Sequence, residues 1–90
     1  IFFFFYFTIR SKKRKIKMKA KIRLDTMHDA AAFVKVTEGL EGKIVVSDAD
    51  GMRVNAKSLM GMLYALEFDE LWCESERDIY SHIEKFIVID

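Results

Sequence analysis

The stretch that decides the fold reads Val54-Asn55-Ala56-Lys57-Ser58-Leu59-Met60-Gly61-Met62-Leu63. The alternating apolar residues before Ser58 are typical of a β-strand, whereas the apolar residues after it recur at helical spacing. Serine is a preferred N-cap residue, because its hydroxyl accepts a hydrogen bond from a free backbone N–H two or three residues further on. The sequence therefore predicts that an extended segment turns into an amphipathic helix at Ser58.

The segment from Val54 to Gly61 closely resembles the regulatory-serine signature of HPr, the histidine-containing phosphocarrier of the bacterial sugar phosphotransferase system. Members of that family typically read Val-Asn-(Ala/Leu)-Lys-Ser-(Ile/Leu)-Met-Gly at this place. Residues 18–88 also follow the family's order of strands and helices. The resemblance implies an open-faced sandwich, in which a four-stranded antiparallel sheet carries three helices on one face. It further implies a cytoplasmic protein that needs no cofactor.

The apolar pattern alone predicts an α+β domain with the order β-α-β-β-α-β-α. The expected strands are residues 17–24, 43–47, 52–56 and 71–74. Asp50-Gly51 marks the turn between the second and third of them, because Asp-Gly is a strong hairpin signal.

Three helices are expected between and after these strands. The first begins at an N-cap Thr26, which Asp29 complements in the first turn, and its predicted buried stripe is Met27, Ala30, Ala31, Phe33, Val34 and Thr37. The second helix runs over residues 58–66. The third runs over residues 77–86, and its predicted buried side chains are Ile79, Tyr80, Ile83 and Phe86.

Length and charge restrict the class of protein. Ninety residues suffice for one small domain. The single cysteine, Cys73, excludes an internal disulfide and fits a reducing compartment. Residues 1–17 hold six cations and no acid, whereas residues 18–90 hold nine cations and all fourteen acids. The globular part is therefore acidic, which argues against nucleic acid as its partner.

Residues 1–17 form an apolar and then basic leader that differs from the rest of the chain. Its apolar run is too short to span a bilayer, and its charges follow the apolar part instead of preceding it, unlike those of a secretory signal. The leader fits the end of a membrane segment, a surface-binding anchor, or sequence that is not part of the native protein. We favour the last interpretation, because Met18 stands where the HPr-like domain (residues 18–90) would begin. We therefore expect no membrane contact unless the leader is native.

The histidine motif departs from the family pattern. HPr proteins carry phosphate on a histidine in Gly-(Leu/Ile)-His-Ala-Arg-Pro-Ala, whereas this chain reads Asp25-Thr26-Met27-His28-Asp29-Ala30. The arginine and the proline are missing, and Asp29 places a carboxylate beside the imidazole of His28. A gapless alignment through the helix puts Thr26 at the place of the family's histidine. We expect His28 to be an exposed residue of the first turn, with a phosphoryl carrier as the alternative.

Ser58 keeps its family context better, and we expect regulatory phosphorylation there. The positions in the family that correspond to Leu59, Met60 and Leu63 dock partner proteins, so these residues and Lys57 are the candidate partner-binding residues; burial of the apolar three in the core is the alternative. No independent catalytic site or metal-ligand spacing occurs. The expected partners are proteins of the phosphotransferase system or an HPr-kinase-type regulator, contacted by a monomer. The competing functions are a genuine phosphocarrier that uses His28 and an interaction module without phosphorylation.

Overall fold

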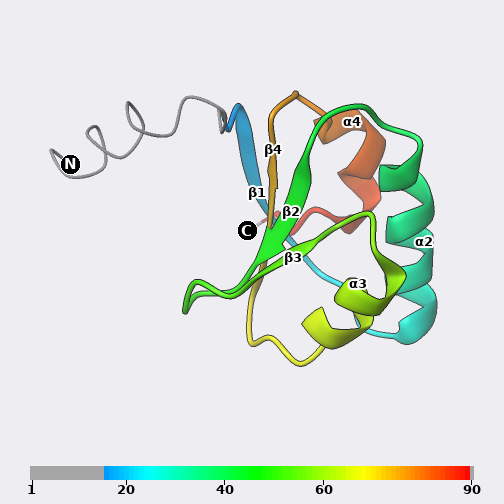
Figure 1. Cartoon of the computed structure of the whole chain (residues 1–90), viewed down its shortest axis with the longest axis vertical. Helices are drawn as coiled ribbons and strands as arrows, with labels where there is room; N and C mark the ends of the chain where they lie inside the picture. Colours follow the sequence, from blue (N-terminus) through cyan, green and yellow to red (C-terminus); the bar gives the residue numbers. More distant parts are fainter. Residues whose placement is uncertain (1–15, 90) are drawn as a thin grey trace, which may run out of the picture.

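The elements follow one another as strand, helix, strand, strand, helix, strand, helix (Figure 1). The computed structural model describes residues 16–89, so most of the leader lies outside the described residues. The strands are β1 (Met18–Ile22), β2 (Ile44–Ser47), β3 (Arg53–Asn55) and β4 (Leu71–Ser75). The helices are α2 (Met27–Glu38), α3 (Leu59–Ala65) and α4 (Tyr80–Ile83), and the 3-10 turn η1 (Glu84–Phe86) extends the last of them. The predicted α+β order is confirmed.

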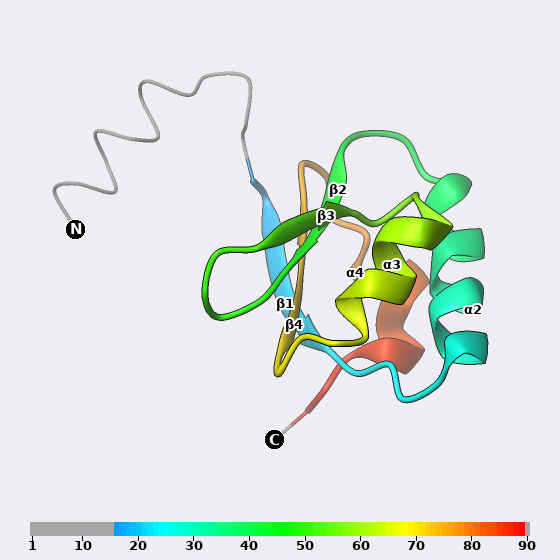
Figure 2. The ribbon, with the colours of Figure 1, turned by 60° about the horizontal axis from the view of Figure 1, so that its bottom comes forward.

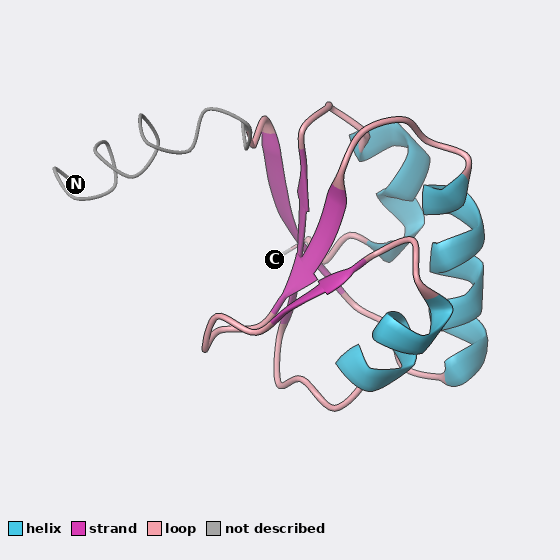
Figure 3. Cartoon of the chain, in the orientation of Figure 1, coloured by secondary structure: helices cyan, strands magenta, loops and turns pink. Residues whose placement is uncertain are grey.

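The four strands form one antiparallel sheet in the order β1-β4-β2-β3. The two long-range pairings bring β4, near the end of the chain, between β1 and β2. All three helices lie on one side of this sheet, and within residues 16–89 no further layer covers the opposite side (Figures 2 and 3). This is the predicted open-faced sandwich. Within residues 16–89, no helix combines the length and the apolar character needed to cross a bilayer.

The core fills the space between the sheet and the helices. Ile44 and Val46 of β2 point into it, as their alternation predicts, and meet Phe33 of α2 and Met62 of α3 in one buried cluster. The ring of Phe33 packs edge-on against the ring of Phe86, with 5.2 Å between the centroids. Such an arrangement places the positive edge of one ring against the negative face of the other.

The buried hydroxyl of Thr37 links α2 to the segment that precedes α3. The hydroxyl of Thr37 lies within hydrogen-bond distance of two carbonyl oxygens. Its Oγ1 is 2.8 Å from the carbonyl oxygen of Ala56 and 3.0 Å from that of Val34. Ala56 lies directly before the turn that leads into α3, so this contact fixes that turn against α2. The polar group is satisfied, which removes the cost of burying it.

Three predictions of buried side chains are wrong. Met27 is 67% exposed, and Ala31 and Tyr80 are also exposed. Met27 is the first residue of α2, and Ala31 lies one turn further along the same edge, so the buried stripe is narrower than predicted. Helix α4 begins at Tyr80 and tightens into η1, and only Ile79, Ile83 and Phe86 then face the core.

The helix-free side of the sheet centres on a buried carboxylate. Glu74 of β4 is only 6% exposed, although no helix covers this side. Its oxygens accept hydrogen bonds from Arg53 Nη2 at 2.7 Å and Ser47 Oγ at 3.0 Å, and Lys19 Nζ lies 3.8 Å away. One carboxylate thus contacts a side chain from each of the other three strands. A buried charge is tolerated when it is paired and hydrogen-bonded in this way.

Trp72 lies beside this cluster on the same side. The ammonium groups of Lys19 and Lys21 lie 5.5 and 5.9 Å from its ring centroid, and its indole N–H donates to Glu70 Oε1 at 3.0 Å. Trp72 is therefore a half-buried residue of the helix-free side.

We predict that Glu74→Gln lowers the free energy of unfolding by about 2 kcal/mol, because it leaves Arg53 and Lys19 without their buried counter-charge. Urea unfolding followed by circular dichroism measures this loss. Glu67→Gln on the exposed loop after α3 makes the same chemical change and is the matched control, with an expected effect below about 0.5 kcal/mol. Equal effects of the two variants would contradict the assigned role of Glu74.

Burial raises the pKa of the Cys73 thiol to about 12, and the negative charge of Glu74 adds to this rise. The unfolded chain therefore loses the thiol proton at lower pH than the folded chain does. The thiol's contribution to stability is complete below pH 9 and is lost as the pH rises towards 12.

We predict that the wild type loses stability more steeply than Cys73→Ala between pH 9 and 11, by up to about 1.4 kcal/mol per pH unit. Urea unfolding of both proteins across this range measures the difference. The alanine variant serves as the control, because the other alkaline groups titrate alike in both proteins. Parallel curves would show that burial does not hold the proton on this thiol.

Candidate functional site

The predicted N-cap is confirmed at Ser58. Its backbone is extended (φ −102°, ψ 118°), and its Oγ accepts the N–H of Gly61 at 3.1 Å. The side chain is half-buried, so the hydroxyl sits at the boundary between the protein and the solvent. Its proton is not used by the cap, because the oxygen acts there as the acceptor.

The residues before Ser58 form a tightly bonded turn. The Ser58 N–H donates to the carbonyl of Asn55 at 3.0 Å, and the Lys57 N–H donates to the side-chain oxygen of Asn55 at 2.9 Å. The ammonium of Lys57 donates to the carbonyl of Leu40 at 2.6 Å, across the loop that follows α2. Lys57, a predicted partner-binding residue, is half-buried. Its side chain links the turn before α3 to the loop after α2.

The outward side of α3 is apolar. Met60 is 83% exposed and Leu59 is 46% exposed, whereas Leu63 is only partly exposed. Tyr64 follows Met60 by one helical turn, is 54% exposed and packs edge-on against Phe68. We call Leu59, Met60, Leu63 and Tyr64 the α3 surface. Met62 and Ala65 bury the opposite side of the helix.

Tyr64 is not among the residues that the sequence predicted to bind partners. Its distance of four residues from Met60 is the signal that places both on one side of a helix. Leu59, Met60 and Leu63 were each predicted to be either docking or core residues. In the structure Leu59 and Met60 are exposed, whereas Leu63 is intermediate in exposure.

The start of α2 forms a closed capping box. Thr26 is the N-cap, and its Oγ1 accepts the N–H of Asp29 at 3.1 Å. In return, Asp29 Oδ2 accepts the N–H of Thr26 at 3.2 Å and that of Asp25 at 3.0 Å. The carboxylate of Asp29 thus places a negative charge at the start of α2, where an anion would otherwise be favoured.

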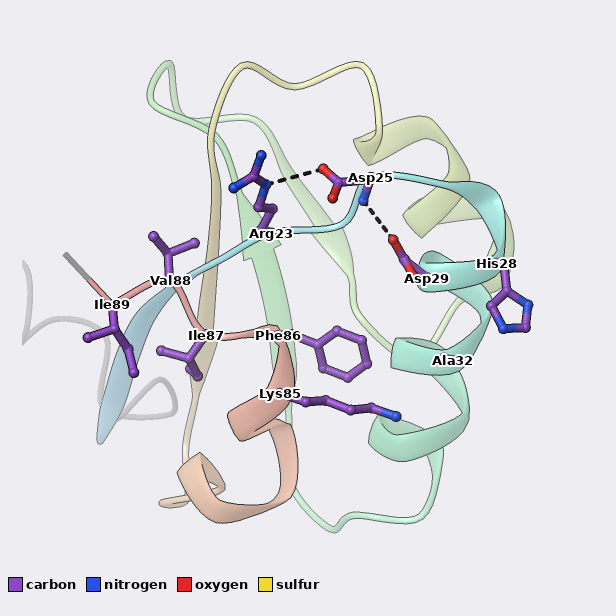
Figure 4. A pocket seen from close by; sticks show the side chains of 10 residues that line it. All are labelled: Arg23, Asp25, His28, Asp29, Ala32, Lys85, Phe86, Ile87, Val88 and Ile89. Carbon is purple, nitrogen blue, oxygen red and sulfur yellow. Dashed lines mark hydrogen bonds and ion pairs between the residues drawn. The ribbon is translucent and has the colours of Figure 1, made fainter.

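His28 lies in the first turn and is exposed, as predicted. A cavity of about 580 Å³ opens between the start of α2 and the end of the chain, and His28 is on its rim (Figure 4). In Figure 4 the imidazole points away from Arg23 and Asp25, which form an ion pair of 3.3 Å. Arg23 therefore does not place its positive charge next to the imidazole of His28.

The turn between β2 and β3 is stabilised by an aspartate side chain. Asp48 Oδ1 accepts the N–H groups of Asp50 and Met52 at 2.8 and 2.9 Å, so it stabilises the turn between β2 and β3. Gly51 in that turn has φ +95°, a conformation that favours glycine. His82 is exposed on α4. No group of three or more histidine, cysteine, aspartate or glutamate side chains within residues 16–89 is arranged to hold a metal ion.

Comparison of the chain with protein-family models, with curated proteins and with solved structures found no match. The function of the site is therefore inferred from its geometry and from the sequence motif.

We predict that Asp29→Ala lowers the free energy of unfolding by about 1 kcal/mol, because it removes the acceptor of two backbone N–H groups and a favourable charge at the start of α2. Glu38→Ala removes the same charge at the other end of α2, where a carboxylate is unfavourable, and is expected to cost little or to stabilise slightly. Thermal or urea unfolding of both variants measures the contrast. A larger loss for Glu38→Ala would contradict the assigned role of the capping box.

Proposed function

We propose that this protein is an HPr-like regulatory protein of the phosphotransferase system, which acts through protein–protein contacts and is controlled by phosphorylation of Ser58. The observation that carries the proposal is the position of Ser58, a half-buried N-cap at the border of the exposed α3 surface. The sequence signature Val54–Gly61 and the open-faced sandwich are consistent with that family.

The hydroxyl of Ser58 is suited to phosphoryl transfer by a kinase. Its oxygen attacks the γ-phosphorus of ATP, its proton passes to a base of the kinase, and ADP departs as the P–O bond to the γ-phosphorus breaks. The product carries about two negative charges beside the free N–H groups at the start of α3, where a negative charge is favourable. No acidic side chain lies in the first turn of α3 to repel it. Phosphorylation is therefore compatible with the fold.

The α3 surface supplies the contact that such a phosphate regulates. Methionine side chains are flexible and polarisable, and they adapt to more than one partner. Ser58 directly precedes Leu59 and Met60, so a phosphate there adds charge at the edge of an apolar contact. A partner with cations around an apolar groove gains affinity, and a partner with an entirely apolar groove loses it.

Two observations favour this role over a phosphocarrier that uses His28. The capping box fills the helix start with the carboxylate of Asp29, which repels an incoming phosphoryl group. The N-cap itself is Thr26, which has no imidazole nitrogen to act as the nucleophile. The third candidate, an interaction module without phosphorylation, uses the same α3 surface but predicts that Ser58→Asp leaves partner binding unchanged.

We predict that a recombinant HPr kinase incorporates one phosphate from labelled ATP into the wild type and none into Ser58→Ala. Ser81→Ala, which removes an exposed serine from α4, is the matched control and is labelled like the wild type. Mass spectrometry of the peptides locates the phosphate.

Absence of label in the wild type, under conditions that label an authentic HPr, would contradict the proposal. The phosphocarrier alternative is tested in parallel with phosphoenolpyruvate and the general phosphotransferase enzyme. Acid-labile phosphate that disappears in His28→Ala would favour that alternative.

A further inference from the structure

The edge of the sheet at β3 presents backbone groups that β2 does not use. The N–H of Ala56 bonds to the carbonyl of Ile44 and the N–H of Asp48 bonds to that of Met52, both at 3.0 Å. Bonded pairs alternate along an antiparallel ladder, so Val54 is bonded to Val46 between them. The backbone groups of Arg53 and Asn55 consequently point outward, away from β2.

One of the outward groups is already used, because the carbonyl of Asn55 accepts the N–H of Ser58. Three groups remain, namely the N–H of Arg53, its carbonyl and the N–H of Asn55. They form a donor–acceptor–donor row at the last strand in the sheet order. A further β-strand that adds to the edge of a sheet forms its main-chain hydrogen bonds with such a row of groups.

Cations surround this edge. A groove of about 360 Å³ lies at β2 and β3, and its lining includes Lys43, Arg53 and Lys57 as well as Val45 and Asn55. Among residues 16–89, no carboxylate lines the groove. Glu74 pairs with the Arg53 guanidinium, and the Lys57 ammonium donates to the Leu40 carbonyl. The exposed side chain of Lys43 has no hydrogen-bond partner within residues 16–89. The lining of the groove therefore carries positive charge, and Lys43 is the cation that is available to a ligand.

We propose that β3 binds an extended acidic segment of another protein, which adds to the sheet as a fifth strand. The partner residues opposite Arg53 and Asn55 project to the helix-free side, where the cations lie, and are acidic. The residue between them lies opposite the half-buried Val54, on the side of the helices, and is apolar. The recognised pattern is thus acid–apolar–acid. This site is separate from the α3 surface and does not depend on phosphorylation of Ser58.

Two other occupants fit the edge less well. A free phosphate is attracted by the cations but is repelled by the carbonyl of Arg53, which lies between the two N–H groups. A second copy of the chain, paired β3 to β3, brings Arg53 and Lys43 against the same cations, and like charges across a strand pair are destabilising.

The proposal is tested by titrating the full-length ¹⁵N-labelled chain with the peptide acetyl-Glu-Val-Glu-Val-Glu-amide. We expect saturable binding, with the largest shifts at the amides of Arg53 and Asn55 and at least about tenfold slower hydrogen exchange of these two N–H groups. The uncharged peptide acetyl-Gln-Val-Gln-Val-Gln-amide is expected to bind at least about fivefold more weakly.

Matched charge reversals separate a local from a general electrostatic effect. Lys43→Glu at the groove is expected to raise the Kd for the acidic peptide about fivefold, whereas Lys35→Glu on the exposed side of α2 changes it less than about twofold. Equal effects of the two variants, shifts centred on the α3 surface, or no saturation up to about 5 mM peptide would overturn the proposal. Self-association that protects Arg53 and Asn55 without peptide would assign the edge to a second copy and would overturn it as well.

Discussion

The position of α3 depends on the hydrogen bond from the Gly61 N–H to the Ser58 hydroxyl, 3.1 Å long. A helix of seven residues has little stability of its own, so its cap and its contacts must hold it. Helix α3 packs closely on the preceding strand, since a Cβ built at Gly61 would lie 3.4 Å from both the Asn55 carbonyl oxygen and the Val54 Cβ, at the limit of ordinary van der Waals contact. The cap and this close approach direct Met62 into the core and Met60 into the solvent. The same hydroxyl thus sets the fold locally and borders the surface to which we assign function.

Features that depend on neighbours in the sequence were predictable. The positions of β1 and β2, the caps at Thr26 and Ser58 and the exposure of His28 follow from spacings of two to four residues. The extent of burial was less predictable, because it depends on where a helix lies over the sheet. The network around Glu74 joins residues 21 to 55 positions apart. No local pattern marks such a network, so the sequence gives no reason to expect a buried carboxylate on the uncovered side.

Net charge was a poor guide to the surface for a similar reason. The acids outnumber the cations between residues 18 and 90, yet three cations line the groove at β3 and two more flank the ring of Trp72. These cations lie on or next to the strands, whereas most of the acids lie in the loops that connect the strands and helices. The domain therefore offers two different surfaces, an apolar one on α3 and a cationic one along the edge of the sheet. They lie on different elements, which is why we propose two contacts that differ in chemistry.

The central claim is that regulation acts through the hydroxyl of Ser58 and not through the imidazole of His28. The most direct measurement is phosphate mapping by mass spectrometry on the protein isolated from the cells that naturally produce it, under conditions that preserve acid-labile phosphate. The account predicts a fraction of molecules with phosphate on Ser58 and none with phosphate on His28. Phosphate on His28, or a chain that is unmodified at Ser58 under every growth condition, would contradict it.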